Sequence, residues 1–99
     1  MVYLSGDIDA ASIGEFQTTV EPLCKESGSK VLLECKSLNY VNSTGFGVLF
    51  TLNRTCQQNG GVFALCTLKS KIKMLMKVLG LVELLTIYPT QEDALEAMK

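Results

Sequence analysis

The residues best suited to chemistry form one short segment, NSTGFG at 42–47, between an apolar run and an amphipathic pattern. A helix that begins here leaves amide groups unpaired at its N-terminus, which is also the positive end of its dipole. Such amides favour a phosphate, whether it belongs to a ligand or is attached to the hydroxyl of Ser43 or Thr44. The alternative is purely structural, because Asn42 or Ser43 is also an ordinary N-cap residue. On residue types alone, capping is the simpler interpretation.

Other kinds of site have little support in the sequence. The chain has no histidine, no carboxylate pair at recognisable spacing and no nucleophile beside a base, so we predict no catalytic residue and no enzymatic activity. The four cysteines are Cys24, Cys35, Cys56 and Cys66. They include no C-x-x-C pair, so we predict neither a metal site nor a cofactor. Each lies in an apolar segment and is expected to be a buried, reduced thiol.

Length and composition restrict the class of protein. Ninety-nine residues, 47% of them hydrophobic, suit one globular domain over 1–99. The net charge of -1, without a long basic run, argues against nucleic-acid binding. No stretch reaches the roughly 18 apolar residues that a membrane span needs, and the N-terminus lacks the features of a signal peptide. We therefore expect a cytoplasmic protein that binds neither nucleic acid nor membranes.

The surrounding pattern alternates strands with helices. Strands are expected at 2–8, at 31–33 with a continuation to 41, at 62–66 and at 84–88. Helices are expected after an N-cap at Asp9, at 45–58, around 72–79 and after Thr90, with Pro22 kinking or ending the first one early. This order predicts an α/β fold with a mixed, mainly parallel sheet of about four strands and four helices. The strands that begin at Val31 and Val62 are expected to be central.

Two of the expected loops follow the carboxyl end of a strand and lead into a helix. In a parallel sheet such loops gather at one edge. We therefore predict that six loop residues are neighbours: Asp9, Ala10, Asn42, Ser43, Thr44 and Gly45.

Taken together, these segments resemble the STAS domain family, which includes bacterial anti-sigma factor antagonists and the C-terminal domains of sulfate transporters. LSGDIDA at 4–10 is similar to the family pattern L-x-G-x-[IL]-D-A. LNYVNSTGFG at 38–47 is similar to L-x-[YF]-[MVI]-D-S-x-G-[LF]-G, the most specific of the matches. Weaker matches at 31–34, 60–61 and 79–81 follow in the family's order. The resemblance covers nearly the whole chain.

The resemblance implies a function. In the family's antagonists the motif serine is phosphorylated by a partner anti-sigma factor that is itself a serine kinase. The unphosphorylated form binds this kinase and frees the sigma factor, and the phosphorylated form lets go. The resemblance thus implies that Ser43 is a phosphorylation site and that the six loop residues bind the partner.

Two departures from the family pattern keep an alternative open. Asn42 stands where the family has an acidic residue, which favours a STAS domain that is not phosphorylated and acts as a scaffold in a stressosome-like or transporter complex. The family usually carries a further strand before residue 1, so here the strand at 2–4 is expected to be a sheet edge. Such an edge can pair with another chain, and a homodimer through it is a further expectation.

Overall fold

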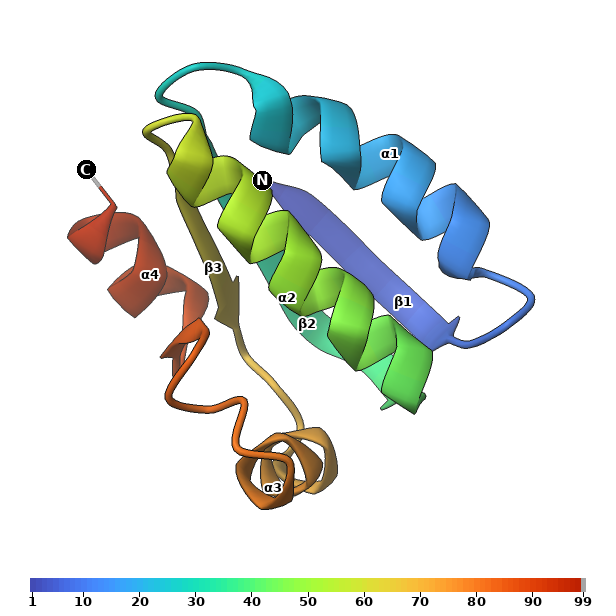
Figure 1. Cartoon of the computed structure of the whole chain (residues 1–99). Helices are drawn as coiled ribbons and strands as arrows, with labels where there is room; N and C mark the ends of the chain where they lie inside the picture. The colour runs from blue at the N-terminus through green and yellow to red at the C-terminus, as the bar shows by residue number, and fades with distance from the viewer. Residues whose placement is uncertain (99) are drawn as a thin grey trace.

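The computed structural model describes residues 1–98, in which four strands alternate with four helices (Figure 1). The elements are β1 (Val2–Ile8), α1 (Ile13–Lys25), β2 (Lys30–Val41), α2 (Ser43–Gln58), β3 (Val62–Cys66), α3 (Ser70–Val78), β4 (Thr86–Tyr88) and α4 (Gln91–Ala97). The predicted alternation is confirmed. Within the described part of the chain, no helix combines the length and the apolar character needed to cross a membrane.

The strands form one sheet in the order β1-β2-β3-β4, and every neighbouring pair is parallel. The α/β prediction is therefore confirmed, with a sheet that is parallel throughout the described residues instead of mixed. β2 and β3 are central, as the continuous apolar runs at Val31 and Val62 predicted, because a strand covered on both faces needs apolar side chains on both. β1 and β4 are the two edges of the sheet.

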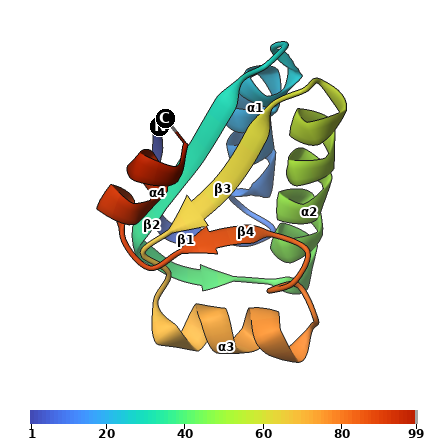
Figure 2. The same cartoon turned by 90° about the vertical axis from the view of Figure 1, so that its left-hand side faces the viewer.

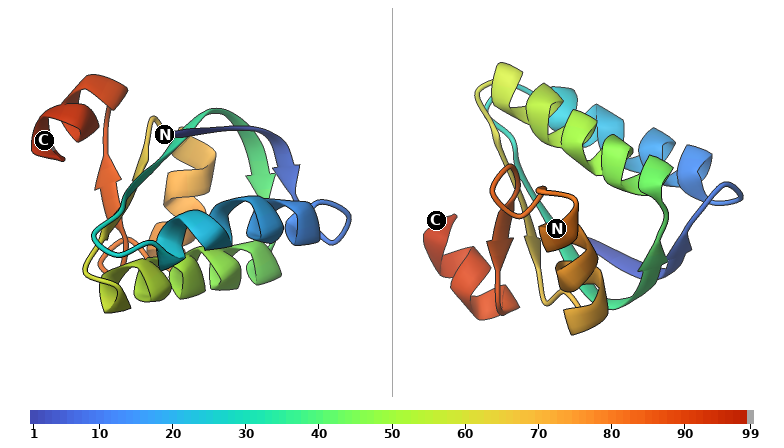
Figure 3. Two further views of the ribbon diagram at one scale, coloured as in Figure 1. Left: turned by 90° about the horizontal axis from the view of Figure 1, so that it is seen from above. Right: turned by 60° about the horizontal axis from the view of Figure 1, so that its bottom comes forward.

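The two faces of the sheet are covered unequally. α1 and α2 lie side by side over one face (Figures 1 and 3), and the large core is on this side. Its sheet residues include Val31, Leu33 and Cys35, which alternate along β2 as the period of a strand requires. The other face is covered by α4, through a small cluster in which Ala94 contacts residues of β2 and β3. α3 crosses the end of the sheet (Figure 2).

Several predicted boundaries are wrong by a few residues. α1 does not end at Pro22 but continues to Lys25, because Val20 and Cys24, on either side of the proline, are completely buried and hold the last turn in place. α2 begins at Ser43, two residues before Gly45. β4 begins only at Thr86, because the residues before it form a turn.

Four apolar side chains that the helical spacing placed on inward faces are exposed. They are Leu23 of α1, Leu75 of α3, Leu79 after α3 and Leu95 of α4, with 38%, 38%, 53% and 47% of their surface accessible. Each lies at the margin of an apolar stripe. A helical period places a residue on a face, but the width of that face is set by what packs against it.

All four cysteines are buried and unpaired, as predicted. Burial in apolar surroundings raises the pKa of Cys24 and Cys35 to about 12 and that of Cys66 to about 11. Glu34, which accepts a hydrogen bond from the Cys66 thiol at 3.1 Å, further disfavours a Cys66 thiolate. With these pKa values, less than about one molecule in a hundred carries a thiolate at any of these three sites at pH 8. Since the thiolate is the reactive form, the three cysteines are expected to react slowly.

We predict that the native protein reacts slowly with a thiol reagent at all four cysteines. The unfolded chain, with ordinary thiol pKa values, should react at least a hundredfold faster. The rates can be compared at pH 8 with and without denaturant, using a chromogenic disulfide. Complete labelling of Cys35, Cys56 and Cys66 within the dead time of the native measurement would contradict the prediction.

Candidate functional site

The two loops singled out in the sequence lie side by side at the carboxyl end of the sheet. Ile8, the last residue of β1, is paired with Val41, the last residue of β2. The Asn42 amide donates to the Ile8 carbonyl at 3.0 Å, which ties the two chain segments together where they leave the sheet. Asp9 therefore follows β1 next to the point where α2 begins, as the parallel-sheet argument predicted.

Asp9 organises a turn before α1 instead of capping the helix itself. Its Oδ1 accepts from the amides of Ala11 and Ser12, at 3.0 and 3.2 Å. The residue before the helix is Ser12, whose hydroxyl donates to the Asp7 carbonyl at 2.6 Å and caps nothing. The prediction of Asp9 as N-cap is thus wrong by three residues, because an aspartate can bind the free amides of a turn as well as those of a helix. Ala10 is exposed within this turn.

Asn42 is the N-cap of α2. Its side-chain oxygen accepts from the Gly45 amide at 2.7 Å, and its carbonyl accepts from the Phe46 amide at 3.0 Å. Of the two alternative caps, Asn42 is therefore the one used. This leaves Ser43 as the first residue of the helix, with an exposed side chain.

The hydroxyls of Ser43 and Thr44 are exposed and make no hydrogen bond to another residue in 1–98. The first turn of α2 carries no acidic side chain. Since Asn42 satisfies only the Gly45 amide, the amides before it in the first turn remain available at the positive end of the helix. An anion at this position is electrostatically favoured, by about 0.3–1 kcal/mol at an exposed site.

Gly45 brings the start of α2 into direct contact with the sheet. A Cβ atom at this position would lie 2.7 Å from Val41 Cγ1 and 2.9 Å from Ile8 Cγ2, closer than atoms in proteins approach. Only glycine permits this approach, and the contact holds Ser43 and Thr44 on the outside of the molecule. Sequence reasoning placed Gly45 on the partner surface, whereas the structure buries it.

A cationic surface on α3 was missed in the sequence analysis. Lys69, Lys71, Lys73 and Lys77 lie within nine positions, around the exposed side chains of Met74 and Val78. α3 crosses the same end of the sheet at which α2 begins (Figure 2), and the Lys69 ammonium donates to the Asn39 side chain near the end of β2. The lysine spacing was the available signal, but only the apolar residues Ile72, Leu75, Met76 and Leu79 entered the helix prediction.

The structure gathers no alternative kind of site here. Within residues 1–98, histidine, cysteine and acidic side chains form no group of three or more that could hold a metal ion. The carboxyl end of the sheet presents small side chains and the free hydroxyl of Ser43. It also presents the N-terminus of α2, where an anion is electrostatically favoured. This chemistry suits contact with another protein and modification by a phosphate.

The family model of the STAS domain matches residues 1–94. The chain is 25% identical, over its whole length and 86% of the relative's, to an anti-sigma F factor antagonist of Paenibacillus polymyxa. It is 26% identical, over 96% of its length and 86% of the relative's, to an anti-sigma-B factor antagonist of Bacillus subtilis.

Two solved structures show the same fold. An anti-sigma factor antagonist from Mycobacterium paratuberculosis superposes with a TM-score of 0.85 at 20% identity, covering 97% of this chain and 81% of that one. The STAS domain of a SulP transporter from Vibrio cholerae gives a TM-score of 0.74 at 21% identity, covering 97% of this chain and 77% of that one.

The contact at Gly45 can be tested without any partner. We predict that Gly45→Ala destabilises the protein by about 1–3 kcal/mol, because the added methyl group is forced against Val41 and Ile8. The matched control is Gly47→Ala in the same helix. No atom lies within 4 Å of a Cβ there, so that variant should gain about 0.5–1 kcal/mol from helix propensity. Urea unfolding of the three proteins measures both values, and equal effects of the two substitutions would refute the close approach.

Proposed function

This chain belongs to the STAS domain family, and we propose that it is an anti-sigma factor antagonist whose partner binding is switched by phosphorylation of Ser43. In this proposal the unphosphorylated protein binds an anti-sigma factor that is also a serine kinase, and the phosphorylated protein releases it. The protein acts by binding in the cytoplasm and catalyses no reaction. The names of the two relatives described above, each an antagonist of an anti-sigma factor, support the general role.

The observation that carries the proposal is the free, exposed hydroxyl of Ser43 at the start of α2. A kinase must bring this hydroxyl to the γ-phosphate of ATP, so the oxygen has to be accessible and not already engaged. Asn42 takes over the capping role, and Ser43 is left free to react.

Phosphorylation is expected to act on binding and to leave the fold intact. A phosphate adds a charge of about −1.5 to −2. At the start of α2 this charge meets the positive end of the helix dipole, so the folded domain tolerates it. In a contact surface, the same charge must lose its water, at a cost of several kcal/mol unless a basic partner matches it. Since each 1.4 kcal/mol changes the affinity tenfold, partial desolvation is enough to switch binding off.

A second candidate function is a scaffold role without phosphorylation, in a stressosome-like or transporter complex. Two observations favour it: the neutral Asn42 in the position where the family carries an acid, and a fold shared with a transporter STAS domain. The two functions differ in what a phosphate on Ser43 does to binding.

We predict that phosphorylation of Ser43 lowers the affinity for the cognate anti-sigma factor at least tenfold and changes the free energy of unfolding by less than about 1 kcal/mol. Calorimetry with the enzymatically phosphorylated and the unmodified protein measures the first value, and urea unfolding the second. Ser43→Ala should bind at all times and take up no phosphate. Thr44→Ala, the neighbouring control, should still be phosphorylated. Equal affinity of the two forms would favour the scaffold function.

We also predict that five of the six loop residues, Asp9, Ala10, Asn42, Ser43 and Thr44, contribute to the partner surface, and that the buried Gly45 acts only by holding them in place. Thr44→Lys adds a long cation to an exposed position and should weaken binding about tenfold or more, while the fold is retained. Asp9→Lys should also weaken binding. Asp9→Asn removes the negative charge but keeps the turn, because an amide oxygen can still accept hydrogen bonds from the amides of Ala11 and Ser12. The matched control is Thr86→Lys, at an exposed position in β4. Unchanged binding of both lysine variants at loop positions would place the partner elsewhere.

A further inference from the structure

α3 carries apolar side chains on its outer side as well as on the side that packs against the domain. Ile72 and Met76, four positions apart, are buried in the core. Met74 and Val78, also four positions apart, are 66% and 78% exposed. Val78 is the most exposed of the large apolar side chains in residues 1–98, and its neighbour Leu79 is 53% exposed. Because side chains four positions apart lie one above the other on a helix, Met74 and Val78 form an outward apolar stripe.

Lysines adjoin this stripe on both sides. Lys71 and Lys77 are each three positions from Met74, and residues three positions apart are neighbours on the surface of a helix. Lys73 lies one turn before Lys77. Four of the nine basic residues of the chain fall at 69–77, a stretch that holds none of its ten acidic residues. The outer face of α3 is therefore cationic in a protein whose net charge is -1.

These charges are arranged against the stability of α3. The helix begins after Lys69 without a side-chain cap and with no acid in its first turn, although this end of a helix dipole is positive. Lys73 is four positions from both Lys69 and Lys77, a spacing at which like charges repel. Lys71, Lys73 and Lys77 form no ion pair within residues 1–98. Carboxylates supplied by another molecule would relieve this repulsion.

A hollow of about 400 Å³ lies beside the same helix. Lys73 and Lys77 line it together with Gly80, Val82 and Glu83 from the turn that follows α3. The single carboxylate of Glu83 cannot balance both ammonium groups. The hollow thus leaves room for an acidic side chain of a partner next to the two lysines.

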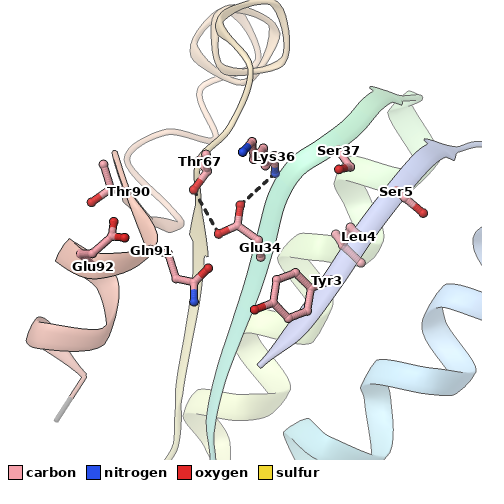
Figure 4. Close-up of a pocket in the computed structure, with 10 residues that line it drawn as sticks. All are labelled: Tyr3, Leu4, Ser5, Glu34, Lys36, Ser37, Thr67, Thr90, Gln91 and Glu92. Carbon is pink, nitrogen blue, oxygen red and sulfur yellow. Dashed lines mark hydrogen bonds between the residues drawn. The ribbon is translucent and has the colours of Figure 1, made fainter.

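A larger hollow, on the α4 side of the sheet, differs in this respect. It measures about 530 Å³, and the buried Glu34 is one of its lining residues (Figure 4). One oxygen of this carboxylate accepts from the Lys36 amide at 3.0 Å, and the other accepts from the Thr67 hydroxyl and the Cys66 thiol, each at 3.1 Å. The Glu34 carboxylate is thus satisfied inside the domain, whereas the lysines of α3 face outward without a counter-charge.

We propose that the outer face of α3 binds an acidic amphipathic helix of a partner protein. Two helices pack when the side chains of one lie between those of the other, and an amphipathic helix recognises its target through apolar side chains three and four positions apart. Such side chains would cover Met74 and Val78, and carboxylates on either side of them would meet the lysines. Met74 suits this contact because a methionine side chain is flexible and polarisable.

Other occupants fit this surface less well. Residues 69–84 contain no aromatic side chain, the kind that anchors a helix in a membrane interface or stacks on nucleic-acid bases. A second copy of the chain would offer α4 as its most acidic helix, but α4 exposes a single large apolar side chain, Leu95. Since α3 and not the Ser43 loop forms the surface, the inference does not rest on the phosphorylation switch.

The experiment uses the whole isotope-labelled chain and a synthetic helical peptide that has leucines along one face and glutamates on both sides of them. A lactam bridge on the opposite face keeps the peptide helical. We expect saturable binding in an NMR titration, with the chemical-shift changes centred on α3. Two control peptides should bind about tenfold more weakly. One carries lysine in place of each glutamate, and the other has the same composition with the leucines distributed around the helix.

Three variants locate the binding. Lys71→Glu and Val78→Gln should each weaken binding of the acidic peptide about fivefold or more. Lys71→Glu should at the same time raise the urea midpoint of unfolding, because an acid in the first turn suits the helix dipole. Lys30→Glu makes the same charge change at the exposed start of β2, at the opposite end of the sheet, and should leave the affinity unchanged.

An unchanged affinity of Lys71→Glu and Val78→Gln would overturn the proposal, as would an equal loss in Lys30→Glu or equal binding of the peptide with distributed leucines. Tighter binding of α3 to phosphatidylglycerol vesicles or to a DNA duplex than to the acidic peptide would also overturn it, in favour of a membrane or a nucleic acid. A dimer in sedimentation that Val78→Gln dissociates would show that a second copy occupies the surface instead.

Discussion

The close approach of α2 to the ends of β1 and β2 is the contact on which the arrangement of the candidate partner-binding edge depends. It is possible because position 45 has no side chain, so the helix backbone lies directly on Val41 and Ile8. The Asn42 side chain stabilises the first turn of α2 by accepting a hydrogen bond from the Gly45 amide. A helix seated this way cannot rotate about its axis without a clash, and the direction in which Ser43 points follows from it.

This seating also explains why the edge can hold its backbone in place and still leave a hydroxyl exposed. Loops after parallel strands are often mobile, yet here the chain enters the helix one residue after β2 ends. The Asn42 amide is bonded to β1, and its side chain is bonded to α2. The backbone at Ser43 is therefore held in place. Its hydroxyl is free and lies at the positive end of the α2 dipole. A phosphate attached there would change the charge of the surface without having to reorganise the backbone.

The unequal covering of the sheet decides where its surface is hollow. α1 and α2 bury one face of the sheet, but α4 is only seven residues long and covers the other face mainly over β2 and β3. β1 is left with a hollow on either side. Glu34 illustrates the consequence, because its neighbours on the inner face of β2 are apolar while its own carboxylate opens toward the uncovered part of the other face.

The sequence by itself determined the order of the elements, the central position of β2 and β3 and the convergence of the Asp9 and Ser43 loops, because apolar period and parallel connectivity are local properties with few solutions. It could not decide between Asn42 and Ser43 as the cap, since both residue types accept amide hydrogen bonds equally well. The tertiary structure decided this through the exact start of α2, which packing against Ile8 and Val41 sets. It also decided which margins of the helices are exposed and which faces of β1 are hollow, because both depend on segments distant in sequence that cover a surface or leave it open.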